Sequence, residues 1–372
     1  MVNPARRISI DGLSARGSWF ATAKVAFMVA ALSSCSTVSS IQHPFKMPSI
    51  ENGSQQGEVW PAPPAVPRYA FIGHIYGESN ARDEVQNRGS LARFWAAVVG
   101  LDAKKKSMLD VVRPQQVTTD NKGKVYVTDP GLQSIFVFDE SLQEFVVWNE
   151  RSLNFSLPSP IGIVHAEDSI WVTDSELALV YRLSLSGEVI NSFGRDVLKR
   201  PTGISFDPQG GRFFISDTDA GDIKLFNTRG ELIDTWGSAG SADGQFNHPT
   251  YLVYRRDRLY VVDSLNARIQ IFDQQGQFIR VVGQRGLYVG NFSRPKGIAL
   301  DSDGNVYVSE SYYDYLLIYN QQGELLLSIG GSGPAAGQFS QPTGVWVDDR
   351  DRVFVSDMLN GRISMFQYLG SN

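Results

Sequence analysis

Six carboxylates recur at one position of a repeated pattern in this chain of 372 residues, and a ring of carboxylates could hold a cation. They are Asp129, Asp174, Asp217, Asp263, Glu310 and Asp357. A second interpretation is structural, because a carboxylate can accept hydrogen bonds from the backbone of a nearby turn, and here also from Arg268 or Arg362. A binding site is usually local, whereas a scaffold feature repeats. The pattern therefore favours the structural role.

A second set of acids precedes the turn between the first two expected strands of a repeat, where aspartate bonds its own backbone. This set comprises Asp120, Asp207, Asp301 and Asp348. The stretch 301–305 (DSDGN) superficially matches a calcium-binding loop, but Tyr312 stands where such a loop needs a glutamate. The chain's four histidines lack the spacing of metal ligands: His43, His74, His165 and His248. The sequence therefore predicts no metal, no cofactor and no catalytic residue.

The elements that carry these acids are six copies of one pattern of Pro-x-Gly, a turn after Asp, Tyr-Val-x-Asp, an alternating apolar strand and Gly-Glu. The copies start at Pro114, Pro160, Pro201, Pro249, Pro295 and Pro342, which gives spacings of 46, 41, 48, 46 and 47 residues. Each copy holds four short strands with turn residues between them. One such sheet cannot bury both faces alone, so neighbouring sheets must stack. The sequence predicts an all-β, six-bladed β-propeller with four-stranded antiparallel blades.

The repeat resembles the NHL family, whose marks here are Pro-x-Gly, Tyr-Val-x-Asp and Asp-x-x-Asn-x-Arg-Ile. The last mark is complete at 263–269 and 357–363 and partial at 217–223, and the other repeats depart from it. The resemblance covers about residues 68–367 and implies the propeller fold rather than a function. With the segment PPAVPRYAFIG at 63–73 and the N-terminal signal described below, the whole chain resembles a group of bacterial six-bladed propeller lipoproteins.

The sixth repeat has three expected strands and no fourth, so the ring needs a strand from elsewhere to cover its open edge. Tyr69–Gly73 (YAFIG) resembles the outer strands at 278–283 and 325–330. We expect it to supply the missing strand and close the ring. The stretch Leu91–Leu101 (LARFWAAVVGL) has the apolar spacing of a short amphipathic helix on the propeller face, and an irregular strand is the alternative.

The N-terminal residues read as a secretory signal, with a basic stretch, the short apolar run Val25–Leu32 and small residues after it. Leu32–Cys35 (LSSC) resembles the bacterial lipobox, which implies cleavage before Cys35, the only cysteine, and its lipidation. Ser36 in place of an aspartate resembles outer-membrane sorting, with the protein facing the periplasm. A secreted or periplasmic protein without the lipid is the alternative.

Three parts follow from these observations. We expect a lipoprotein signal peptide at 1–34, a Pro- and Ser-rich tether at 35–67 and an NHL-repeat propeller at 68–372. The tether residues lack the periodic apolar side chains that would bury a core, and their composition is typical of an extended linker.

The net charge of −5 and the pI near 5.5 oppose nucleic acid as the main partner, because phosphate binding needs a basic field. The fifth repeat has Tyr312, Tyr313 and Tyr315 where repeats four and six carry Asn-x-Arg, and Tyr288 precedes them in a loop. Tyrosine is enriched at interfaces, so these four residues are the candidate partner-binding surface.

We therefore expect a non-enzymatic binding or scaffold protein of the bacterial cell envelope that engages a protein or glycan through a propeller face. The alternative is a metal-dependent hydrolase or lyase with its site in the central channel, similar to gluconolactonase or an amidating lyase. Three or more His, Glu or Asp side chains that converge on one point of the channel would favour the enzyme.

Overall fold

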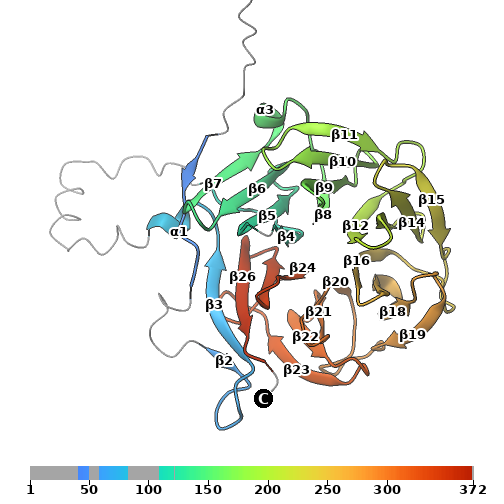
Figure 1. Ribbon diagram of the computed structural model, residues 1–372. Coiled ribbons are helices and arrows are strands. Elements are labelled where there is room, and N and C mark those ends of the chain that lie inside the picture. The colour runs from blue at the N-terminus through green and yellow to red at the C-terminus, as the bar shows by residue number, and fades with distance from the viewer. Residues whose placement is uncertain (1–40, 50–57, 83–108, 121, 371–372) are drawn as a thin grey trace, which may run out of the picture. The chain divides into compact units, whose positions relative to one another are not determined.

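The computed structural model describes residues 41–49, 58–82, 109–120 and 122–370, and these residues form a six-bladed β-propeller (Figure 1). Each blade is one antiparallel sheet, as the repeat predicts. No helix within these ranges is long and apolar enough to cross a membrane. The signal peptide, Cys35 and the stretch 91–101 lie outside the described residues, so the expectations for them stay predictions.

In each of the first three blades, consecutive strands of the repeat lie side by side in chain order, from the innermost strand to the outermost. Blade one contains β4 (Val117–Thr119), β5 (Lys124–Asp129), β6 (Ser134–Asp139) and β7 (Glu144–Trp148), with β1 (His43–Pro44) added at its outer edge. Blade two contains β8 (Pro160–Ala166), β9 (Ser169–Asp174), β10 (Leu179–Ser184) and β11 (Val189–Phe193). Blade three contains β12 (Pro201–Asp207), β13 (Arg212–Asp217), β14 (Asp222–Asn227) and β15 (Leu232–Trp236).

The remaining blades keep this order, and the last one recruits strands from the start of the chain. Blade four contains β16 (Pro249–Arg255), β17 (Arg258–Asp263), β18 (Arg268–Phe272) and β19 (Phe278–Val282). Blade five contains β20 (Pro295–Leu300), β21 (Val306–Glu310), β22 (Tyr315–Tyr319) and β23 (Leu325–Gly330). Blade six contains β24 (Pro342–Val347), β25 (Arg352–Asp357), β26 (Arg362–Tyr368), β3 (Tyr69–Ile75) and β2 (Val59–Trp60). The short helices are α1 (Ser79–Arg82), α3 (Glu150–Leu153) and η2 (Ser264–Asn266).

The blades hold together because their inner strands are buried on both faces. All but the first residue of β13 are buried, whereas the outermost strand β15 exposes every residue except Trp236. Phe214 and Leu225 of blade three pack with Leu252 and Val261 of blade four in one apolar cluster. Burial of each such side chain stabilises the fold by about 1.5–3 kcal/mol, so stacking between blades supplies the core that one sheet lacks.

The glycine of Pro-x-Gly is explained by the close approach of neighbouring first strands around the axis. A Cβ on Gly203 would lie 2.7 Å from the carbonyl oxygen of Thr250 in the next blade. Gly162 and Gly297 face the backbone of the following blade in the same way. The absence of a side chain therefore lets the innermost strands meet.

The expected ring closure is confirmed. Strand β3 pairs antiparallel with β26, with Ile75 opposite Ile363 and Tyr69 opposite Tyr368. Figure 1 shows β3, coloured as an early segment, beside the late strand β26. The hydroxyl groups of Tyr69 and Tyr307 are 3.1 Å apart, which ties this strand to blade five as well.

The described parts of the segment 35–67 depart from the free tether that we expect from composition. Strand β1 pairs with β7 through His43 opposite Phe145, and β2 pairs with β3. Phe45 and Met47 belong to the core of blade one, and the Phe45 ring lies 4.7 Å from that of Phe138. Two apolar residues form no periodic pattern, which is why the sequence did not reveal this packing.

Candidate functional site

The two ends of the blades differ in chemistry. In blade four, Pro249 pairs with Asp263 at one end and Arg255 pairs with Arg258 at the other. We call the end that carries the six recurring acids the acid face. The opposite end, which carries the turns between the first and second strands, is the pocket face.

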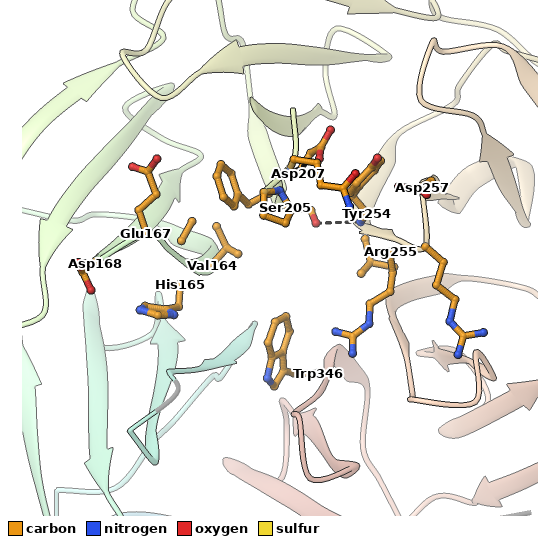
Figure 2. A pocket seen from close by; sticks show the side chains of 16 residues that line it. Val164, His165, Glu167, Asp168, Ser205, Asp207, Tyr254, Arg255, Asp257 and Trp346 are labelled. Atoms are coloured by element: carbon orange, nitrogen blue, oxygen red, sulfur yellow. Dashed lines mark hydrogen bonds between the residues drawn. The ribbon is translucent and has the colours of Figure 1, made fainter. Parts of the chain in front are cut away.

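The pocket face holds a cavity of about 780 Å³ beside the ring axis (Figure 2). Its walls come from the ends of the first strands of blades two, three, four and six and from the turns that follow them. The lining includes His165 from β8, Ser205 from β12, Tyr254 and Arg255 from β16 and Trp346 from β24. The volume lies within the range of about 300–1,000 Å³ that is typical of small-molecule sites.

A hydrogen bond connects two opposite blades across the ring. The Tyr251 side chain is buried, and its hydroxyl donates to the carbonyl oxygen of Gln115 at 3.3 Å. This hydrogen bond joins blade four to blade one, which stands opposite it in a ring of six. The Tyr251 side chain therefore links two opposite blades across the ring.

The aromatic side chains of the pocket are held in place by contacts behind them. The Trp346 Nε1 group donates to the Thr119 hydroxyl at 2.9 Å. The Tyr254 ring stacks on that of Phe214 at 5.2 Å, and its backbone N–H donates to the Ser205 hydroxyl at 2.9 Å. Fixed, half-buried rings of this kind offer flat apolar surfaces to a ligand at low entropic cost.

Most charges of the lining already have partners within the protein. Asp207 accepts from the Arg212 Nε at 3.0 Å and from the backbone of its own turn. Glu167 lies 3.8 Å from Arg182, and Arg256 donates to the carbonyl oxygens of Ser302 and Asp303. These side chains are bound to other groups of the protein, so they form the pocket wall and are not free to bind a ligand.

Arg255 is different, because it is half-buried and its side chain makes no hydrogen bond or ion pair with any residue that the structure describes. Figure 2 shows its side chain extending toward the part of the pocket where Trp346 lies. A guanidinium group carries five donors and stays charged at any physiological pH. The other arginine of the lining, Arg256, is exposed and is bound to the carbonyl oxygens of Ser302 and Asp303.

His165 lines the same pocket in its neutral form. Burial lowers the pKa of His165 below 6.5, although the nearby Asp120 and Asp168 act in the opposite direction. A neutral imidazole donates one hydrogen bond and accepts another, which suits a hydroxyl group.

The six recurring acids lie on the acid face, far from this pocket along the strands, and all are buried. Each accepts hydrogen bonds from backbone N–H groups of the segment that leads into its own blade. The donors are Val112 to Asp129, Ser159 to Asp174, Lys199 to Asp217, Asn247 to Asp263, Ser293 to Glu310 and Ser340 to Asp357. Arg268 and Arg362 donate in addition to Asp263 and Asp357, both from Nε, at 2.8 and 2.7 Å. This geometry matches the structural interpretation of the sequence pattern.

The second set of acids closes turns on the pocket face. Asp120 accepts from the backbone of Lys122 and Lys124, and Asp348 from that of Arg350 and Arg352. Across the described ranges, no three His, Cys, Asp or Glu side chains are placed to hold a metal ion.

The predicted tyrosines lie on the acid-face end of blade five, away from the pocket. Tyr288 and Tyr312 are 83% and 63% exposed, whereas Tyr313 and Tyr315 are half-buried and line a separate cavity of about 170 Å³ with Leu287. The Tyr312 and Tyr313 rings meet edge to face at 4.9 Å. The structure thus brings the four tyrosines to one region but exposes only two of them fully.

Sequence reasoning missed His165, Arg255 and Trp346, which come together from three blades. One signal was present in the chain. The seventh residue of the repeat is aspartate in four copies, but it is Ala166 in blade two and Arg255 in blade four. These are two of the blades that border the pocket, so the break in the repeat marked the site.

Comparison with known proteins supports the architecture. A family model described as a 6-bladed beta-propeller matches residues 241–312. The comparison with curated proteins gave no match.

Solved structures show the same fold at low sequence identity. A catalytically inactive virginiamycin B lyase from Staphylococcus aureus with quinupristin is 14% identical, over 69% of this chain and 95% of that one, with a TM-score of 0.52. An auxiliary nutrient binding protein from Bacteroides thetaiotaomicron is 14% identical over 70% of each chain, with a TM-score of 0.54. An auxiliary nutrient binding protein from Bacteroides ovatus is 12% identical over 69% and 68%, with a TM-score of 0.50. The chain shares with all three the β-propeller fold.

Proposed function

We propose that this protein is a non-enzymatic binding protein of the bacterial cell envelope that holds a glycan in the pocket of blades two, three, four and six. The observation that carries the proposal is the pocket itself. It combines the fixed rings of Trp346 and Tyr254 with the polar groups of His165 and Arg255 in about 780 Å³. A sugar ring has an apolar face and a rim of hydroxyls, and such a lining complements both.

Two further observations support binding as the role. The recurring acids, which are the most conspicuous chemical groups in the sequence, are engaged in hydrogen bonds with the backbone of the segments that lead into their blades. Two of the proteins with this fold are described as auxiliary nutrient binding proteins.

The cellular place in this proposal comes from the sequence. The signal at 1–34 and Cys35 support export and lipid anchoring, in the outer membrane facing the periplasm, and a secreted or periplasmic form is the alternative. Cys35→Ala should move the protein from the membrane fraction to the soluble fraction of fractionated cells. Retention of the variant in the membrane fraction would contradict anchoring at this residue.

A second surface suits a protein partner. Tyr288 and Tyr312 place large amphipathic groups in solvent on the acid-face side of blade five, and Leu287, which precedes Tyr288 in the sequence, is 84% exposed. The double variant Tyr288→Ala/Tyr312→Ala removes exposed rings only, whereas Tyr313 and Tyr315 also line a cavity and would disturb packing. An envelope protein that cross-links stoichiometrically to the wild type and not to this variant would support the surface.

The pocket proposal is tested by a glycan array probed with wild-type protein and with Trp346→Ala. Binding to a defined group of glycans that falls about 5- to 150-fold in Trp346→Ala is the expected result. Stacking of a base on an aromatic ring is worth about 1–3 kcal/mol, and we expect a similar loss for a sugar ring on Trp346. Tyr312→Ala, an exposed aromatic outside the pocket, is the matched control and should bind as wild type does. No glycan bound, or equal binding by wild type and Trp346→Ala, would overturn the proposal.

A further inference from the structure

The seventh residue of the repeat has a structural role in four of the blades, and blade four lacks the side chain that performs it. In blades one, three, five and six this residue is Asp120, Asp207, Asp301 or Asp348, and each aspartate accepts hydrogen bonds from the backbone of the turn that follows. In blade four the residue is Arg255, which can accept no hydrogen bond.

The turn after Arg255 forms without an aspartate at this position. It is two residues long, and both Arg256 and Asp257 have positive φ, 52° and 58°, as in the tight hairpin turns that need no side-chain acceptor. The fold therefore does not need Arg255 for turn geometry. Its side chain is left free to point into the pocket.

The charges around Arg255 leave it as the cation that a ligand would meet. Asp207 is neutralised by Arg212 at 3.0 Å, and Glu167 lies 3.8 Å from Arg182. Asp168 and Asp257 occupy exposed turn positions at the rim, where water screens their charge. Arg255 is half-buried, so its attraction for an anion is screened less.

We propose that the pocket selects sugar acids, with the ligand carboxylate on the Arg255 guanidinium and the pyranose ring against Trp346. Arginine and carboxylate match in a two-pronged geometry that a hydroxyl group cannot reproduce. This inference rests on the proposed glycan-binding function and narrows its ligand class.

Two sources present this chemistry in a cell envelope. Uronic acids carry the carboxylate on the ring, and muramic acid carries it on a lactyl arm. The test therefore uses two probes, a trigalacturonate and the peptide-free disaccharide of N-acetylglucosamine and N-acetylmuramic acid. Each is paired with its methyl ester, which keeps the shape and removes the charge.

Calorimetric titration with the purified full-length protein gives the affinities. For at least one probe, the acid should bind wild type about 10- to 100-fold more tightly than its ester, as expected for a charged hydrogen-bonded pair. Arg255→Gln should abolish this preference, so that acid and ester bind this variant with equal affinity, and Arg255→Lys should restore part of the preference. Arg256→Gln is the matched control, because Arg256 lines the same pocket but is committed to the carbonyl oxygens of blade five.

The outcomes separate the two proposals. Equal affinity for acid and ester, or an acid preference that survives in Arg255→Gln, overturns the sugar-acid inference and leaves glycan binding intact. Binding of only neutral glycans on the array, lost in Trp346→Ala, has the same meaning. No binding of any glycan overturns both. Preference for one acid probe over the other identifies the source.

Discussion

The ion pair between Asp357 and Arg362 offers the sharpest test of the role assigned to the recurring acids. Both side chains are buried, and the Arg362 Nε donates to Asp357 at 2.7 Å. Asp357 also accepts from the Ser340 backbone at 2.7 Å and from the Asn360 amide at 2.8 Å. Asp357→Ala would leave an arginine and two further donors without this acceptor.

The expected loss follows from these contacts. Removal of one partner of a buried ion pair costs about 3–5 kcal/mol, because the other charge stays buried. Arg362 keeps the carbonyl oxygens of Pro334 and Gln338 as acceptors, which places the expected loss toward the lower end of that range. We expect the free energy of unfolding to fall by about 3 kcal/mol in urea titration followed by tryptophan fluorescence.

Two further variants make the result interpretable. Asp219→Ala removes an exposed acid that lies 3.7 Å from Arg200, and it should change the stability by less than about 1 kcal/mol. The double variant Asp357→Ala/Arg362→Met removes the stranded charge, so its loss should be smaller than the sum of the two single losses by at least about 1 kcal/mol. Strict additivity, or a loss below about 1 kcal/mol in Asp357→Ala, would refute the structural role.

Other predictions concern the ring closure and the N-terminal segment. Burial and the adjacent Arg362 lower the pKa of His74 from 6.5 to about 3, so the unfolded chain takes up a proton below pH 6.5 that the folded protein does not. The free energy of unfolding should therefore fall by about 2 kcal/mol between pH 7 and pH 5. Urea titrations of His74→Gln should show a smaller fall, and an equal fall would contradict the assignment. Phe45→Ala should cost about 3–5 kcal/mol if β1 packs as described, while Ile41→Ala at an exposed position should change little by the same assay. Gly203→Ala should cost about 1–3 kcal/mol because a methyl group would press on the Thr250 carbonyl, and an unchanged thermal midpoint would show that the strands can separate there.

The fold was predictable because its information is local and repeated. The starts at Pro160, Pro201, Pro249, Pro295 and Pro342 coincide with the first residues of strands β8, β12, β16, β20 and β24. The ring closure by Tyr69–Gly73 was also predictable, because the sixth repeat has three expected strands where the others have four, and this segment resembles the other outer strands. Both inferences needed only pattern and the rule that sheet edges are covered.

The site was not predictable in the same way. His165, Arg255 and Trp346 are separated by 90 or more residues, and only the closed ring places them on one cavity. The packing of Phe45 and Met47 was not predicted for a related reason, because two apolar residues in a polar stretch form no periodic pattern. What the sequence did offer was an exception to its own repeat at Arg255, and a comparison of the copies position by position exposes it.

The closure of blade six also dictates an order of events as the chain emerges, whether from the ribosome or from an export channel. Strand β3 emerges early, but its partner β26 ends at Tyr368, almost the last described residue. Blades two to five can form from neighbouring segments while β3 waits with an unpaired edge. Contacts so distant in sequence form slowly, and an open edge invites pairing with another chain. A nascent chain of this protein therefore remains vulnerable to association until its final strand emerges, so a carboxy-terminal truncation before β26 should aggregate rather than yield a smaller stable propeller.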